Sequence, residues 1–139
     1  ADFELNDKCS AGTGRFLEVM ARVLEVSIDQ LGPLALRSDS PCTISSTCTV
    51  FAESEVVGRI GAGANPKDIA AGVHASIASK ISTLSRRVGV VSPVCVTGGV
   101  ALNPASRYYL SKHLGTELWM PDNPQLTGAL DAALLSLQA

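Results

Sequence analysis

The sequence has few aromatic residues and no excess of positive charge. Three Phe, two Tyr and one Trp are its aromatic residues, and 11 Lys and Arg stand against 13 Asp and Glu, a formal net charge of -2. Proteins that bind nucleic acid usually combine a basic surface with aromatic side chains that stack on bases. The composition therefore predicts no nucleic-acid partner.

A long hydrophobic run is also missing. The longest uncharged stretch, residues 88–106, is interrupted by three glycines and two prolines, whereas a membrane-spanning helix needs roughly 20 apolar residues in a row. No signal peptide is recognisable, and the chain begins with Ala rather than Met. We therefore expect no membrane segment, a cytoplasmic protein, and either a processed chain or a piece of a longer one.

Cysteine is scarce, and no Cys-x-x-Cys occurs. The four cysteines are Cys9, Cys42, Cys48 and Cys95. Without a secretory signal, reduced thiols are a better expectation than a disulfide framework.

The residues that are present predict alternating helices and strands. Helical spacing of apolar residues indicates helices over about 16–26, 66–88 and 127–137. Thr49 is expected to cap a short helix that has Glu53 in its first turn and ends near Gly61 and Gly63. Asn103 and Pro104 are expected to begin another helix, which ends at Gly115. "PVCVTGG" predicts a strand buried on both faces and "ELWMP" a second one, while residues 27–47 read mostly as loop.

This order of elements predicts an α/β fold with parallel strands. Two strands are few for so much apolar helical surface, so either residues 3–5 add a strand or a missing segment does. The three alanines of the last helix, Ala129, Ala132 and Ala133, are expected to pack closely.

Two glycine-rich turns are candidates for binding an anion or a nucleotide. Gly12, Thr13 and Gly14 open the first helix, and Gly98 and Gly99 follow the buried strand, at the sheet edge where α/β proteins bind nucleotides. Neither turn has the spacing of a P-loop or of a dinucleotide fingerprint. A tight turn with close packing is the alternative for Gly98 and Gly99.

Cys9 and Cys48 each stand a few residues before the start of a predicted helix, where the partial positive charge of the helix end stabilises a thiolate. Iron–sulfur clusters and structural zinc usually take four protein ligands. Either all four cysteines of one chain or two from each of two chains could supply them, and the second is preferred because Cys95 reads as a small hydrophobic core residue. Cysteines with a purely structural role are the competing interpretation.

His74 is predicted to lie at the polar boundary of its helix.

The sequence resembles a known family at four places. "NDKCSAGTGRFLEVMA" and "ISSTCTVFAESEVV" are similar to the activators of 2-hydroxyacyl-CoA dehydratases, which belong to the BadF/BadG/BcrA/BcrD ATPase family together with subunits of benzoyl-CoA reductases. "VTGGVALNP" and "PQLTGALDAAL" resemble the later part of the same family and, more loosely, acetate and sugar kinases, Hsp70 and actin.

The resemblance implies an actin-like, ribonuclease-H-like ATPase fold and a homodimer with one 4Fe-4S cluster shared between the subunits. The cluster ligands would be Cys9 and Cys48, and Gly12, Thr13, Gly14, Gly98 and Gly99 would border ATP or ADP. Such activators pass an electron to a dehydratase or reductase partner with the help of ATP and magnesium.

One departure from the family is large. Its members bind phosphates with two glycine-rich hairpins that carry an Asp, and no Asp-x-Gly occurs in these 139 residues. The chain therefore resembles the carboxy-terminal portion of an activator, a single domain over residues 1–139, and we expect it to hydrolyse ATP poorly by itself. Two alternatives remain for the function. The chain could be a small-molecule kinase-like member of the same superfamily without a cluster, or an inert dimerisation module.

Overall fold

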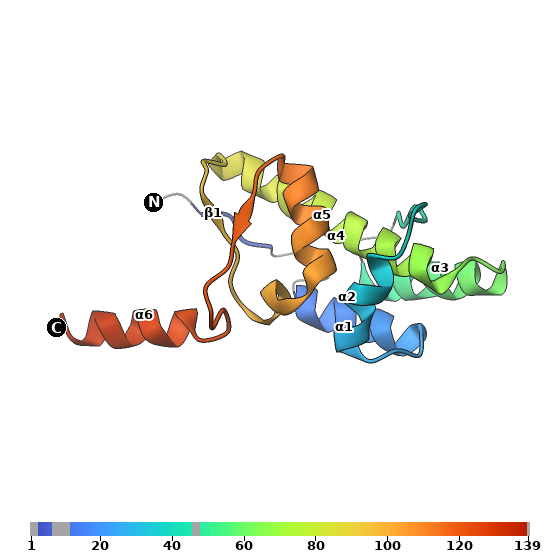
Figure 1. Ribbon diagram of the computed structural model, residues 1–139, viewed down its shortest axis with the longest axis horizontal. Helices are drawn as coiled ribbons and strands as arrows, with labels where there is room; N and C mark the ends of the chain where they lie inside the picture. The colour runs from blue at the N-terminus through green and yellow to red at the C-terminus, as the bar shows by residue number, and fades with distance from the viewer. Residues whose placement is uncertain (1–2, 7–11, 46–47, 139) are drawn as a thin grey trace.

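The computed structural model describes residues 3–6, 12–45 and 48–138 and consists mainly of helices (Figure 1). Its helices and strands, in chain order, are α1 (Thr13–Val23), α2 (Ile28–Ala35), α3 (Thr49–Gly61), α4 (Pro66–Val88), β1 (Val94–Cys95), the 3-10 helix η1 (Gly99–Leu102), α5 (Pro104–Leu114), β2 (Leu118–Trp119) and α6 (Thr127–Ser136). None of the helices in this part of the chain is long and apolar enough to cross a membrane.

Helix α4 runs through the middle of the helical layer and carries much of the core. Helices α1, α2, α3 and α5 all pack against it, and α1 also contacts α2 and α3. The largest fully buried side chains come from these helices: Leu17, Met20, Leu31, Val56, Ile69, Val73 and His74.

The sequence signals for α4 and α5 are confirmed. The Oδ1 atom of Asn65 accepts a hydrogen bond from Lys67 N at 3.1 Å, and Gly89, at φ +80°, ends the helix. In α5, Asn103 is the cap and Gly115 takes the left-handed conformation, φ +70°. Asn followed by Pro at the start and Gly at the end therefore marked both helices correctly.

The two predicted strands form a parallel pair, with Val94 opposite Leu118 and Cys95 opposite Trp119. The expectation that the first strand is buried on both faces was wrong, because Cys95 is exposed rather than packed in the core. Residues 3–6 form no strand, so the described sheet ends with these two strands and one face of β1 stays uncovered.

Helix α2 lies within residues 27–47, which were predicted to be mostly loop. Gly32 and Pro33 usually interrupt helices, yet both lie inside α2. Gly32 is required by packing, since a Cβ atom there would lie 2.5 Å from Oδ1 of Asn103. Tertiary packing of α2 against α4 and α5 has overridden the local signal.

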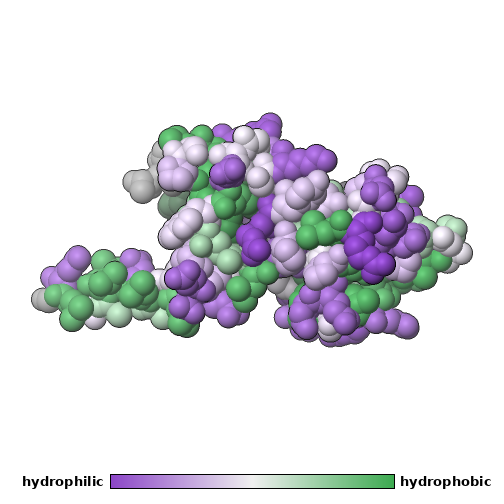
Figure 2. All heavy atoms as spheres, in the orientation of Figure 1, coloured by the Kyte–Doolittle hydropathy of each residue, from purple (hydrophilic) through white to green (hydrophobic). Residues whose placement is uncertain are grey.

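Helix α6 forms as predicted but extends away from the rest of the chain (Figure 1). None of its residues is buried, so the close packing expected of Ala129, Ala132 and Ala133 does not occur. Its surface is largely apolar (Figure 2). The exposed large side chains of α6 and its end are Leu130, Leu134, Leu135 and Leu137.

Candidate functional site

A cleft of about 500 Å³ lies where α1, α2, η1 and α5 meet. It brings together Gly14 and Gly99, two of the residues predicted to border a nucleotide, although they are 85 positions apart in the sequence. The cleft is lined by Gly14, Leu17, Glu18, Ile28, Asp29, Gly99, Val100, Leu102, Asn103, Pro104 and Gln125.

The two glycines leave the cleft open by lacking side chains. A Cβ atom on Gly14 would lie 3.7 Å from Val100, and one on Gly99 would lie 3.4 Å from Nε2 of Gln125. Gly98, just before, has φ +84°, a conformation that favours glycine, and its N–H donates to the carbonyl of Pro124 at 2.7 Å. This bond holds the turn after β1 against the segment that carries Gln125.

The cleft combines apolar walls with a few polar groups, as small-molecule sites do. Glu18, Asp29, Asn103 and Gln125 are its polar side chains. Gly14 also lies in the first turn of α1, where backbone N–H groups lack partners within the helix and attract anions. The arrangement can therefore bind a flat, partly apolar group together with hydroxyls or an anionic group.

Two of these residues were not recognised as site residues from the sequence. Asn103 was identified only as a helix cap and Gln125 was not singled out. The available signal for Asn103 was its place four residues after Gly99, at the end of the turn that follows a strand.

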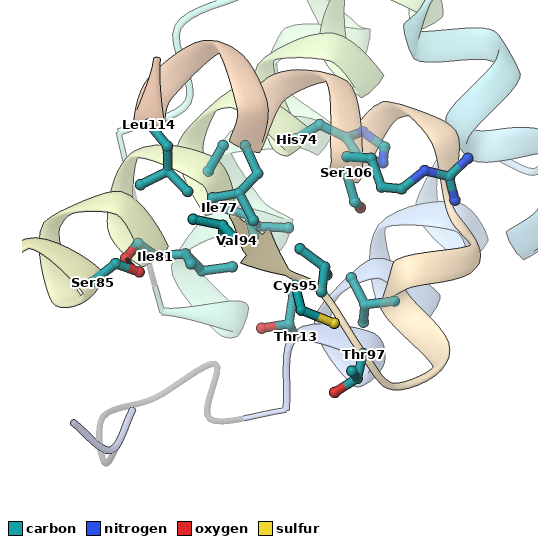
Figure 3. A pocket seen from close by; sticks show the side chains of 15 residues that line it. Thr13, His74, Ile77, Ile81, Ser85, Val94, Cys95, Thr97, Ser106 and Leu114 are labelled. Carbon is teal, nitrogen blue, oxygen red and sulfur yellow. Dashed lines mark hydrogen bonds between the residues drawn. The ribbon is translucent and has the colours of Figure 1, made fainter. Parts of the chain in front are cut away.

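Thr13 does not line this cleft but a second cavity of about 380 Å³, between α4, α5 and β1 (Figure 3). The cavity is mostly apolar. Figure 3 shows His74 and Ser106 on one side of it and Thr13, Cys95 and Thr97 on the other. The first turn of α1 therefore borders both spaces: Thr13 lines the second cavity, and Gly14 lines the cleft.

His74 is buried, with 1% of its surface exposed, so its assignment to the polar boundary of the helix was wrong. Its Nδ1 lies 2.8 Å from the carbonyl oxygen of Ala70, and its ring stacks on Tyr109 with centroids 6.4 Å apart. Burial lowers the pKa of His74, and the Ala70 carbonyl and the nearby side chain of Asn103, which both favour the protonated ring, oppose this only in part. The ring is therefore neutral at pH 7, and Nδ1 carries the proton because a carbonyl can only accept.

Cys48 is the N-cap residue of α3 and is half-buried. Thr49, expected to be the cap, is the first residue of the helix, and Glu53 lies beyond its first turn. Cys9 lies outside the described residues. Among the residues that are described, no three His, Cys, Asp or Glu side chains lie together where they could hold one metal ion.

The segment before Cys48 is tied to α3 by polar contacts. Ser45 donates from its N and Oγ to Oε2 of Glu55, at 3.0 and 2.9 Å. Arg59 Nη2 donates to the carbonyl of Thr43 at 2.9 Å. A thiol held at a helix N-terminus is suited to be a thiolate ligand, so the donor chemistry of Cys48 fits an iron–sulfur cluster.

The fold and the cleft define the class of protein: a helix-rich part of an actin-like ATPase domain, with two parallel strands. Residues 1–136 match the BadF/BadG/BcrA/BcrD ATPase family, and the chain belongs to that family.

Two of the similar relatives are dehydratase activators. The 2-hydroxyisocaproyl-CoA dehydratase activator of Clostridioides difficile is 50% identical over 133 residues, which make up 96% of this chain and 50% of that protein. The (R)-2-hydroxyglutaryl-CoA dehydratase activating ATPase of Acidaminococcus fermentans is also 50% identical, over 96% of this chain and 51% of its own length. The chain thus spans about half the length of these relatives.

Solved structures of both kinds of activator resemble this one closely. Component A of the Acidaminococcus fermentans (R)-2-hydroxyglutaryl-CoA dehydratase superposes with a TM-score of 0.92 at 50% identity, over 97% of this chain and 52% of that one. The Clostridium difficile activator with bound ADPNP has a TM-score of 0.89 at 49% identity, over 96% of this chain and 50% of that one.

Proposed function

We propose that this chain is the carboxy-terminal portion of an ATP-dependent activator that reduces a 2-hydroxyacyl-CoA dehydratase or a related reductase. The observation that carries the proposal is the 50% identity to two dehydratase activators over nearly the whole chain. The match covers about half of each of these relatives. In the assembled protein, a further amino-terminal half would supply the phosphate and magnesium ligands.

The nucleotide would occupy the cleft between α1, η1 and α5. Support comes from Gly14 and Gly99, which both line that cleft, and from ADPNP bound to one of the similar structures. Gly12 and Thr13 would border the nucleotide from the start of α1, and Gly98 would hold the turn that carries Gly99. This half lacks an Asp-x-Gly hairpin, so it would bind nucleotide without hydrolysing it efficiently.

The cluster would be held by Cys9 and Cys48 of one chain and by the same two residues of a second copy. A bound 4Fe-4S cluster supplies a low-potential electron. The contribution of this chain is to present the Cys48 thiol at the positive end of α3 and to tie the preceding loop to that helix through Glu55 and Arg59. Reduced thiols of this kind fit a cytoplasmic protein.

Iron binding tests the proposed function directly. Protein reconstituted with iron and sulfide without oxygen is expected to contain two iron atoms per chain, which is one four-iron cluster per two chains, and to show a broad visible absorbance. Cys9→Ala and Cys48→Ala are each expected to lose most of the iron, because two of the four ligands of a shared cluster disappear with each substitution.

Cys95→Ala is the matched control, since Cys95 is an exposed thiol on β1 and is not a proposed ligand. It should retain the iron of the unchanged protein. Equal iron content in all three variants would refute the assignment of the cysteines, and the absence of iron from the reconstituted parent would refute the cluster itself.

A further inference from the structure

The second cavity contains two buried polar atoms without partners. Nε2 of His74 and Oγ of Ser106 are the buried side-chain nitrogen and oxygen atoms of the described residues that make no hydrogen bond. Both residues line the same cavity, His74 from α4 and Ser106 from α5 (Figure 3). An unpaired polar atom inside a protein costs free energy, so two in one cavity require an explanation.

The two atoms are chemically complementary. Nδ1 of His74 faces the carbonyl of Ala70 and carries the ring proton, which leaves Nε2 as an acceptor. The hydroxyl of Ser106 has a proton to donate. The two atoms make no direct hydrogen bond, but one water molecule in the cavity could accept from Ser106 and donate to His74, which would satisfy both.

Ser106 connects this pair to the nucleotide cleft through Asn103. The Oδ1 atom of Asn103 accepts hydrogen bonds from the N–H groups of Ala105 and Ser106, at 3.0 and 3.1 Å. Asn103 itself lines the cleft that holds Gly14 and Gly99. The first turn of α5 therefore has the cavity on one side, through the Ser106 side chain, and the cleft on the other.

Asn103 has little freedom to move alone. Gly32 of α2 approaches its Oδ1 so closely that any side chain at position 32 would collide with it. If the first turn of α5 shifted, the wall of the cleft would shift with it, because Asn103 is bonded to the N–H groups of that turn.

We propose that His74 and Ser106 are positioning residues for the nucleotide cleft: their side chains pair inside the second cavity and fix the first turn of α5, and with it Asn103. Neither residue touches the nucleotide. This inference rests on the proposed function, in which the cleft is the nucleotide site.

The experiment measures ADP affinity and unfolding free energy for the longest chain that the reading frame encodes. The variants are His74→Leu, Ser106→Ala, the double variant and His74→Gln, whose amide can accept a hydrogen bond. Ser85→Ala is the matched control, because Ser85 lines the same cavity but its hydroxyl already donates to the Ile81 carbonyl at 2.9 Å.

Each single substitution is expected to weaken ADP binding at least about fivefold, and the double variant to be no weaker than the poorer single one, because the pair acts as a unit. His74→Gln should restore part of the affinity, and Ser85→Ala should bind ADP like the parent. Normal ADP affinity in His74→Leu and Ser106→Ala would overturn the positioning role.

The unfolding measurements separate this inference from the proposed function. Non-additive losses of unfolding free energy in His74→Leu and Ser106→Ala support the pair even if the parent binds no ADP, an outcome that would refute the nucleotide site alone. Additive effects, or a gain in stability from both substitutions, would refute the pair whatever the parent binds.

Discussion

His74 illustrates how one buried side chain can make the chain sensitive to pH. Burial holds the pKa of the folded ring below the ordinary value of 6.5. The unfolded chain has no such burial, so its His74 becomes protonated near that value. Above pH 6.5 both states are neutral and His74 adds no pH dependence, whereas below it the unfolded state binds a proton that the folded state does not.

We therefore predict that the free energy of unfolding falls as the pH drops below 6.5, with a contribution from His74 of at most about 1.4 kcal/mol per pH unit. Urea unfolding between pH 7.5 and 5.5 measures this slope. In His74→Leu the slope should be smaller by that contribution, and equal slopes in the parent and the variant would contradict the prediction.

At the scale of the helices, the sequence was most informative where caps and breakers agree with packing. Asn65 and Gly89 delimit α4, and Asn103 and Gly115 delimit α5, because these residues satisfy or terminate the backbone locally. Helix α2 could not be predicted in this way. Its Gly32 allows close packing against Asn103, a residue 71 positions away in the sequence.

The candidate site was predicted only in part for the same reason. Local turn chemistry pointed to Gly14 and Gly99 as candidates, but no local pattern indicates that they share a cleft with Asp29 and Gln125. The helical period of α4 likewise did not identify His74 as buried, because packing on several sides of α4 covers positions outside one apolar stripe.

Gly72 in α4 and Gly58 in α3 form a matched pair of helical glycines. A Cβ atom on Gly72 would collide with the backbone carbonyl of Cys42, whereas one on Gly58 would meet nothing within 4 Å. We predict that Gly72→Ala lowers the free energy of unfolding by about 1–3 kcal/mol, as overpacking does. Gly58→Ala should raise it by about 0.5–1 kcal/mol, because alanine favours a helix.

Urea unfolding of the two variants beside the parent checks both signs. If Gly72→Ala were as stable as the parent, the backbone at Cys42 could move away from α4 at little cost, and the prediction would be wrong.

At the scale of the whole molecule, α6 is a helix that contributes no side chain to the hydrophobic core. It has ten residues, none of them buried, and a helix of that length is marginal in water without packing. Exposed leucines such as Leu130 and Leu134 form an apolar surface on this helix, of the kind that marks an interaction site. The proposed amino-terminal half is the segment that would cover it.

Hydrogen exchange can test this arrangement. In the 139-residue chain we predict that the amides of α6 exchange far faster than those of α4, which is buried on several sides. In a longer chain that includes the amino-terminal half, protection of α6 should rise towards that of α4. Strong protection of α6 in the short chain would contradict the prediction.

Helix α4 brings the two proposed sites nearer to each other than the length of the chain suggests. Gly72 faces the Cys42 segment that precedes Cys48, and His74 faces Tyr109 of α5. Two positions along a helix correspond to a turn of about 200°, so these contacts lie on opposite sides of one helix about 10 Å thick. In the proposed activator, a displacement of α4 would thus move the support of the cysteine loop and the wall of the nucleotide cleft together.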